Sequence, residues 1–271
     1  MGTRVAGKVA LVTGAARGQG RVDALRLAEE GADVIVVDVC APLPSVVYDS
    51  ATPADLAETV DLVAKTGRRV VSGIVDIRDL DALRNIVDDA VAELGRLDII
   101  VANAGICAPK PWDQITSQIF ADTISTNVTG TWNTVMVGAP HLVRGGGGSI
   151  ILISSAAGIK VQPFMVPYTT SKFAVRGMAK AFAAELGKHN IRVNSVHPTG
   201  VATPMGSGGM AAELMAAIGG DERLGAMFIN MMPVDITQPE DVADTVLFLA
   251  SDESKYITAH EIAPDAGVTE F

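Results

Sequence analysis

The stretch Val9-Ala10-Leu11-Val12-Thr13-Gly14-Ala15-Ala16-Arg17-Gly18-Gln19-Gly20-Arg21 decides the fold of this chain. Its apolar run from Val9 to Val12 predicts a strand that is buried on both faces. A glycine cluster follows, and the next apolar residues recur at helical spacing. Glycines let the backbone approach a pyrophosphate, and free N–H groups at a helix start favour negative charge, so the stretch predicts an anion site. The residues expected to form it are Gly14, Arg17, Gly18, Gln19 and Gly20.

A second apolar run, from Asp33 to Asp38, ends on a carboxylate about twenty residues after the glycines. In a dinucleotide-binding fold, a carboxylate at this position accepts hydrogen bonds from the adenosine ribose and repels a 2′-phosphate. Asp38, with Val39 beside it, therefore predicts NAD as the cofactor. Arg17 is a competing signal, because a cation near the ribose favours NADP. We give Asp38 more weight, since its charge would face the phosphate directly.

The rest of the chain alternates strand and helix patterns. Further apolar runs predict strands over residues 70–76, 97–102, 149–155, 191–196 and 261–263. Amphipathic runs predict helices over residues 54–64, 80–94, 112–144 and 168–186. Thr237 and Glu240 predict the N-terminal cap of a last helix. The alternation predicts an α/β fold, a doubly wound (Rossmann) parallel sheet of about seven strands with helices on both faces. We expect residues 1–271 to form a single NAD-binding domain, with Asp76 and Ile77 near the adenine.

Composition excludes several classes of function. The net charge of −10 argues against nucleic acid as a partner, because there is no basic excess to neutralise phosphates. The four histidines lack the spacing of metal ligands, so we expect no metal. The two cysteines, Cys40 and Cys107, are isolated, as in proteins of a reducing compartment. No apolar run approaches the roughly 18 residues of a membrane span, and the first residues lack a signal-peptide pattern. A soluble cytoplasmic protein is predicted.

Two irregular segments lie at the expected ligand-binding edge of the sheet. The first, residues 39–54, is longer than an ordinary crossover loop and lies beside the cofactor, and its apolar content favours packing over disorder. The second, residues 204–236, is rich in glycine and methionine and predicts a flexible lid over an apolar substrate. Its methionines are Met205, Met210, Met215, Met227, Met231 and Met232.

Three side chains carry the expected chemistry. Tyr168 and Lys172 lie four positions apart at a helix start and share one face. A nearby ammonium stabilises a phenolate, so we expect Lys172 to lower the pKa of Tyr168 into the range of proton transfer. Ser155, at the end of a predicted strand, would donate a hydrogen bond to a carbonyl or alkoxide oxygen, and its spacing from Tyr168 favours it over Ser154. Alone, a tyrosine and a lysine at this spacing usually mark only a solvated helix face.

In combination, these motifs resemble the short-chain dehydrogenase/reductase family over essentially the whole chain. The residues that carry the resemblance are the glycine loop, Asp38, Asn103-Ala104-Gly105, Asn127, Ser155, Tyr168 and Lys172. The resemblance implies that Tyr168 is the acid/base, Ser155 orients the substrate oxygen and Lys172 binds the nicotinamide ribose. It also implies that Asn127 holds a water in a proton relay and that Thr203 meets the nicotinamide carboxamide. The further cofactor contacts implied are Asn103, Ala104, Gly105, Tyr168, Pro198, Gly200 and Val201.

A narrower resemblance joins the glycine loop to Asp38-Val39-Cys40-Ala41-Pro42 and Ala51-Thr52-Pro53-Ala54-Asp55-Leu56. These stretches resemble the mycofactocin-linked, carveol-dehydrogenase-like subgroup. That resemblance implies an NAD that does not exchange and a separate redox carrier, mycofactocin, that regenerates it. Family members often form homotetramers by pairing the helices that carry Asn127 and Tyr168.

We therefore predict an NAD-dependent dehydrogenase of an apolar, terpenoid-like secondary alcohol. One alternative is an NADPH-dependent 3-oxoacyl carrier-protein reductase, which Asp38 and the acidic composition disfavour. The other is a nucleotide-binding regulator without catalysis, which has no need of the complete set of Ser155, Tyr168 and Lys172.

Overall fold

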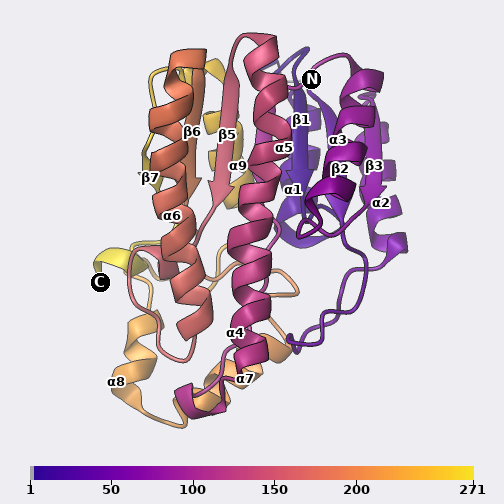
Figure 1. Ribbon diagram of the computed structural model, residues 1–271. Helices are drawn as coiled ribbons and strands as arrows, with labels where there is room; N and C mark the ends of the chain where they lie inside the picture. The colour runs from indigo at the N-terminus through magenta and orange to yellow at the C-terminus, as the bar shows by residue number, and fades with distance from the viewer. Residues whose placement is uncertain (1–2) are drawn as a thin grey trace.

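A computed structural model describes residues 3–271 of the chain. One parallel sheet runs through it in the strand order β3-β2-β1-β4-β5-β6-β7 (Figure 1), which confirms the predicted doubly wound fold of seven strands. The strands are β1 (Val9–Thr13), β2 (Asp33–Asp38), β3 (Val70–Ile74), β4 (Ile99–Ala102), β5 (Gly148–Ile153), β6 (Ile191–Val196) and β7 (Glu261–Ile262). The helices are α1 (Gly18–Glu29), α2 (Pro53–Lys65), α3 (Leu80–Leu94), α4 (Ser117–Ile124), α5 (Gly130–Gly145), α6 (Val166–Leu186), α7 (Gly209–Ile218), α8 (Glu222–Gly225) and α9 (Pro239–Ala250).

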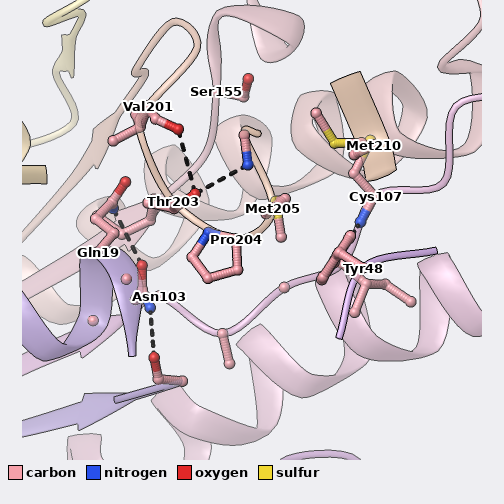
Figure 2. A pocket seen from close by; sticks show the side chains of 18 of the residues that line it. Gln19, Tyr48, Asn103, Cys107, Ser155, Val201, Thr203, Pro204, Met205 and Met210 are labelled. Carbon is pink, nitrogen blue, oxygen red and sulfur yellow. Dashed lines mark hydrogen bonds between the residues drawn. The ribbon is translucent and has the colours of Figure 1, made fainter. Parts of the chain in front are cut away.

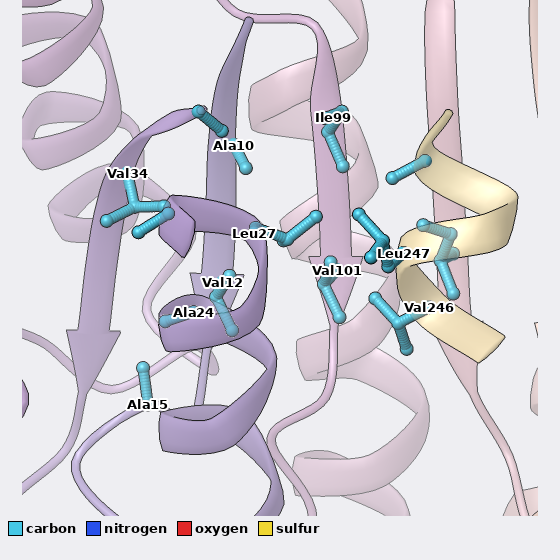
Figure 3. Close-up of a cluster of buried hydrophobic side chains, with 14 of the residues drawn as sticks. Ala10, Val12, Ala15, Ala24, Leu27, Val34, Ile99, Val101, Val246 and Leu247 are labelled. Atoms are coloured by element: carbon cyan, nitrogen blue, oxygen red, sulfur yellow. The ribbon is translucent and has the colours of Figure 1, made fainter. Parts of the chain in front are cut away.

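Helices cover both faces of the sheet because its central strands are apolar on both sides. On one face, α1, α2 and α9 pack on side chains such as Val12, Val34 and Val101 (Figure 3). On the other face, α3, α5 and α6 pack on Leu11, Ile100 and neighbouring residues. Every residue of β1, β2 and β4 is buried. This double burial is what a continuous apolar run predicts for a parallel strand.

Helices α2 and α9 both begin with a capping box, and the cap of α9 differs from the prediction. Thr52 caps α2 by accepting a hydrogen bond from the Asp55 backbone N–H at 3.2 Å. The predicted cap of α9 was wrong by one residue. The Thr237 hydroxyl donates to the Gly200 carbonyl, and the cap is Gln238, whose backbone N–H donates to Asp241 at 2.8 Å. Thr237 is drawn away because it pairs in a β-bridge with Val201, a contact between residues far apart in the sequence.

The sheet changes direction between β1 and β4. From β1 the chain builds outward through β2 and β3, and from β4 it builds outward on the other side. Since all the strands are parallel, their carboxyl ends lie together at one edge, and a crevice opens where the direction changes. Thr13, Asp38, Ala102 and Ile153 are the last residues of the four strands at this crevice.

Two irregular segments lie beyond the carboxyl ends of the strands (Figure 1). We call residues 39–52 the strap and residues 204–236 the lid. The strap, predicted over 39–54, has no helix or strand of its own and ends where Thr52 caps α2. The lid contains α7 and α8. The two segments touch, since a Cβ on Gly209 of α7 would lie 2.6 Å from the Val47 carbonyl oxygen.

Candidate active site

The glycine loop between β1 and α1 is shaped by close backbone contacts. Gly14 and Gly18 have φ angles of +67° and +56°, a region that favours glycine. A Cβ on Gly20 would lie 2.2 Å from the Gly14 carbonyl oxygen, so only glycine fits there. Helix α1 begins without a side-chain cap, since the Arg17 side chain makes no capping hydrogen bond. Its first N–H groups therefore remain available to a phosphate, as a dinucleotide site requires.

Asn103, at the end of β4, joins the two central strands. Its side-chain amide donates to the Thr13 carbonyl at 3.0 Å, and its carbonyl accepts from the Gln19 side chain at 3.1 Å (Figure 2). The Thr13 hydroxyl accepts from the backbone N–H groups of Asn103 and Ala104 at 3.1 and 3.2 Å. These hydrogen bonds fix the glycine loop against the end of β4, which lies beside β1 in the sheet.

Asp38 lies at the mouth of the crevice, and 9% of its surface is exposed. One carboxylate oxygen accepts from the Ala16 N–H of the glycine loop at 3.0 Å, and the other from the Cys40 N–H at 3.2 Å. Each oxygen keeps acceptor capacity for a ribose hydroxyl. The competing cation, Arg17, has another partner, because its guanidinium donates to the Asp49 carbonyl of the strap.

Tyr168 and Lys172 face each other near the start of α6, which begins at Val166 rather than at Tyr168. The Lys172 Nζ lies 5.4 Å from the centroid of the Tyr168 ring and donates to the Ile153 carbonyl at 2.8 Å. Burial lowers the pKa of Lys172 to about 8. The prediction that the pKa of Tyr168 is lowered was wrong for the protein without its cofactor. Burial raises the pKa of Tyr168, and a hydrogen bond with Ser155 only partly opposes this effect.

Ser154 and Ser155 both line the cavity but have different roles. The buried Ser154 hydroxyl donates to the Lys172 carbonyl at 2.9 Å and so fixes α6 against β5. The Ser155 hydroxyl accepts from the Ala157 N–H at 3.1 Å, and its proximity to Tyr168 opposes the rise in the pKa of that residue. Ser155 is therefore the hydroxyl that can share a substrate oxygen with Tyr168.

Asn127 lies in a π-helical turn, Ser125–Thr129, between α4 and α5. Such turns often occur at functional sites. Its amide donates to the Ile106 carbonyl at 2.9 Å and to the Ser171 hydroxyl at 3.0 Å, and it accepts from the Ile106 N–H at 2.8 Å. Asn127 does not line the cavity. Its side chain holds the chain after Gly105 against α6, and the water-holding role remains a prediction.

Thr203 lies in the loop that leads from β6 to the lid. Its hydroxyl donates to the Val201 carbonyl at 3.4 Å and accepts from the Gly206 N–H at 3.1 Å (Figure 2). A Cβ on Gly18 would lie 3.3 Å from the Thr203 Cβ, so this loop faces the glycine loop across the cavity. In the same loop, the Thr199 hydroxyl donates to the Asn230 side-chain carbonyl at 2.9 Å.

A cavity of about 410 Å³ connects these parts. All of the residues predicted to bind the cofactor line it, and so does Ser155. These are Gly14, Arg17, Gly18, Gln19, Gly20, Asp38, Val39, Asp76, Ile77, Asn103, Ala104, Gly105, Tyr168, Lys172, Pro198, Gly200, Val201 and Thr203. The glycine loop, the uncapped start of α1 and the carboxylate of Asp38 together fit a dinucleotide. Lys172 and Tyr168 line the same cavity on the other side of β4.

Several residues that line the cavity were missed from the sequence. The main ones are Tyr48, Arg78, Cys107 and Met165. Cys107 stands two positions after the Asn103-Ala104-Gly105 triplet, which was a usable signal. Tyr48 had no local signal, because nothing in the strap sequence says where the strap crosses the sheet edge.

The expectation that six lid methionines cover the substrate was wrong for four of them. Met205 and Met210 line the cavity. Met215, Met231 and Met232 are 66%, 55% and 58% exposed, and Met227 does not line the cavity either. In a short helix such as α7, residues on one side face the cavity while those on the other face solvent.

Within residues 3–271, no helix is long and apolar enough to cross a membrane. No group of three or more His, Cys, Asp or Glu side chains in the same residues is arranged to hold a metal ion. Cys40 and Cys107 are free thiols.

Comparison with known proteins gives matches over nearly the whole chain. The family described as enoyl-(acyl carrier protein) reductase matches residues 14–269. A short-chain-type dehydrogenase/reductase of Mycolicibacterium smegmatis is 49% identical, over 98% of this chain and 99% of the relative. A short-chain dehydrogenase of Mycobacterium paratuberculosis bound to NAD is 58% identical, with a TM-score of 0.97 over 99% of this chain and 100% of the other. Carveol dehydrogenase of Mycobacterium avium in complex with NAD is 45% identical, with a TM-score of 0.93 over the same shares.

Proposed function

The chain belongs to the short-chain dehydrogenase/reductase family, and we propose that it transfers a hydride between NAD and a secondary alcohol or its ketone. The observation that carries the proposal is one cavity with the glycine loop and Asp38 at one end and Ser155, Tyr168 and Lys172 at the other. The first end suits a dinucleotide, and the second supplies a proton donor and acceptor beside a fixed ammonium.

NAD is the cofactor that this cavity favours. The Asp38 carboxylate would face the 2′-phosphate of NADP at close range, which costs on the order of a few kcal/mol at an effective dielectric constant near 20. The Arg17 guanidinium is held by the strap carbonyl of Asp49, so it offsets only part of this cost. The solved relatives from Mycobacterium paratuberculosis and Mycobacterium avium hold NAD.

The side chains of the protein itself carry out the proton transfer of the reaction. NAD, when bound, accepts or returns the hydride. In the oxidation direction, the Tyr168 phenolate takes the hydroxyl proton of the alcohol, and Ser155 holds the same oxygen by a hydrogen bond. Lys172, fixed by the Ile153 carbonyl, places a positive charge beside the phenol ring and stabilises its ionised form. The positive charge of the nicotinamide ring would, with NAD bound, work against the rise that burial causes in the pKa of Tyr168.

The substrate is an apolar cyclic alcohol. The cavity lining includes several apolar side chains from the lid and from the segment before α6, namely Met165, Met205, Met210, Leu214 and Phe228. Methionine adapts to irregular apolar shapes. The similarity to a carveol dehydrogenase supports a terpenoid-like ring.

The bound NAD is retained between turnovers, and an external redox carrier, mycofactocin in the subgroup that the sequence resembles, regenerates it. The contacts of the strap support this proposal. It is attached to Arg17 on one side of the cavity and, through Ser45, to Asp122 of α4 on the other. It also meets the lid at Gly209, so that the two segments together close over the cofactor.

The protein assembles as a homotetramer through α5, α6 and their flanks. Large apolar side chains are exposed there, namely Phe120, Trp132, Met136, Val143, Val166 and Phe173. Such a surface on a water-soluble domain is typical of a protein interface.

A carrier-protein reductase is the second candidate, because the matching family is described by an acyl carrier protein reaction. Carrier-protein recognition needs a basic surface for an acidic partner, whereas this chain has a net charge of −10. The two candidates also differ in cofactor, NAD against NADPH.

One experiment tests the proposal. Purified protein is given a cyclic terpene alcohol, a charged hydroxy acid or an acyl-thioester ketone, and the absorbance of the reduced cofactor is followed. We expect turnover of the terpene alcohol with bound NAD. A preference for the hydroxy acid would contradict the apolar substrate, and reduction of the thioester with NADPH would favour the second candidate.

A further inference from the structure

Tyr48 is a polar side chain that the strap brings to the cavity wall, beside Cys107. Its hydroxyl accepts a hydrogen bond from the Cys107 backbone N–H at 3.4 Å (Figure 2). The figure shows Tyr48 beside Cys107 and Met210. Tyr48 comes from the strap after β2, whereas Ser155 follows β5, so the two side chains reach the cavity from different parts of the fold.

The strap holds Tyr48 in place from both sides. Before it, the Ser45 hydroxyl donates to the Asp122 carboxylate on α4. After it, the Asp49 carbonyl accepts from Arg17 of the glycine loop. The Leu43 N–H also donates to the Ser50 hydroxyl at 3.0 Å, which closes the strap into a compact loop. A side chain held in this way can select a ligand, because little ordering entropy is lost when the ligand binds.

The hydroxyl of Tyr48 has a proton to donate. A phenol donates one hydrogen bond and can accept others, and the Cys107 N–H uses acceptor capacity only. Among residues 3–271, the Tyr48 hydroxyl makes no hydrogen bond as a donor. Met210, which lies beside Tyr48 in Figure 2, offers no strong acceptor. Burial also raises the pKa of Tyr48, so the proton stays on the phenol at neutral pH.

We propose that Tyr48 is a specificity-determining residue that donates a hydrogen bond to a second oxygen of the substrate, away from the carbon that reacts. The inference rests on the proposed function, because it takes the reacting oxygen to be the one held by Ser155 and Tyr168. It narrows the substrate class from apolar rings to rings with two oxygens, such as a hydroxyketone, a diol or a diketone. Such a donor gives selectivity, because a buried polar group that the ligand leaves unpaired is costly.

The test compares two ketones that differ by one oxygen, cyclohexanone and 1,4-cyclohexanedione. Their dissociation constants are measured by calorimetry on NAD-loaded protein, a state in which neither ketone can be reduced. We expect wild-type protein to prefer the dione beyond the factor of two that its equivalent carbonyls give. In Tyr48→Phe the ratio of the two constants should fall by about tenfold, with cyclohexanone binding unchanged or slightly tighter.

Ser45→Ala is the matched control, because it releases the strap from Asp122 without removing a group from the cavity. It should lower the ratio of the two constants by less than Tyr48→Phe does, because the phenol hydroxyl is still present. If Tyr48→Phe weakens both ketones equally, or if Ser45→Ala lowers the ratio as far as Tyr48→Phe does, the assignment of Tyr48 is overturned. Turnover of cyclohexanol and 1,4-cyclohexanediol is measured in parallel. If neither alcohol is oxidised while the ratio still changes in Tyr48→Phe, the proposed reaction fails and Tyr48 keeps its role.

Discussion

The floor of the cavity and its cover are built in different ways. The floor consists of strand ends and helix starts, and its polar side chains are held by the backbone of neighbouring elements. Asn103 is bonded to β1, Ser154 to α6 and Lys172 to β5. The cover consists of the strap and the lid. The strap has no regular structure, and single contacts such as Ser45 with Asp122 attach it to the rest.

This difference separates two tasks. Hydride transfer needs reacting groups held within a fraction of an ångström, which rigid elements provide. Retention of a cofactor and choice of a substrate need a surface that can open and can vary, which loops on a rigid scaffold provide. We therefore expect changes in the floor to affect catalysis and cofactor choice, and changes in the cover to affect retention and substrate binding.

Tyr168→Phe should show the largest effect in the floor. It removes the group that moves the proton and leaves the ring in place. The rate of alcohol oxidation should fall by about 10²–10⁴-fold, the usual contribution of general acid–base catalysis. NAD should still copurify with the variant. Retention of more than about a tenth of the wild-type rate would show that Tyr168 is not the acid/base.

Asp38→Ala should change the cofactor preference. Wild-type protein should prefer NAD over NADP by at least about a hundredfold, since like charges at close range cost a few kcal/mol, and the variant should lose most of this preference. The ratio of the two dissociation constants, measured on protein stripped of its cofactor, checks the prediction. Asp49→Ala is the control, because it removes a nearby charge of the strap and leaves the carbonyl that holds Arg17. An equal change in both variants would mean that general charge, rather than the position of Asp38, sets the preference.

Deletion of residues 43–50 should affect the cover alone. The shortened protein should lose its NAD on a desalting column, while wild-type protein and Tyr168→Phe keep theirs. The absorbance of the eluted protein at the adenine band measures occupancy. If the shortened protein keeps its NAD, the floor of the cavity and not the strap is what retains the cofactor. If wild-type protein is already empty after gentle purification, the retention proposal is wrong, while the role of Asp38 is unaffected.

Asp23, in the middle of α1, is an exception among the buried polar side chains. It is completely buried, and neither carboxylate oxygen has a hydrogen-bond partner. Burial raises its pKa well above the ordinary value. As the pH rises past about 4, the unfolded chain releases this proton while the folded chain keeps it, so the folded state loses stability.

Asp23→Asn should therefore be more stable than wild type by about 1–3 kcal/mol at pH 7. The gain should disappear near pH 3, where the carboxyl is protonated in both states. Urea unfolding at the two pH values measures it. An equal difference at both pH values would show that ionisation is not the cause.

The ion pair of Lys110 with Glu213 should give the smallest effect. The two side chains meet at 2.6 Å and join the loop after β4 to α7 of the lid. Both are partly exposed, so we expect Lys110→Met to raise KM only a few-fold, with kcat nearly unchanged. The double reversal Lys110→Glu with Glu213→Lys should restore KM, and Arg84→Met, in an exposed pair on α3, should have no effect. A large fall in kcat would show that the lid helps to position the reacting groups.

The sequence by itself determined the floor. Alternation of apolar runs identified the seven strands and most of the helices, because strand and helix depend on spacing within a few turns of the chain. The glycine loop, Asp38 and the pair Tyr168 and Lys172 were found for the same reason. Each of these is a local pattern. A parallel sheet brings the carboxyl ends of its strands to one edge, and this does not depend on which residues lie at the protein surface.

Only the tertiary structure decided the cover and the electrostatics. The place of Tyr48, the exposure of Met215 and the cap at Gln238 all depend on contacts between residues far apart in the sequence. The pKa of Tyr168 was predicted in the wrong direction because spacing gives the distance to Lys172, while desolvation depends on everything packed around the ring. Irregular segments satisfy their hydrogen bonds against other parts of the fold, so their path is fixed only once the fold exists.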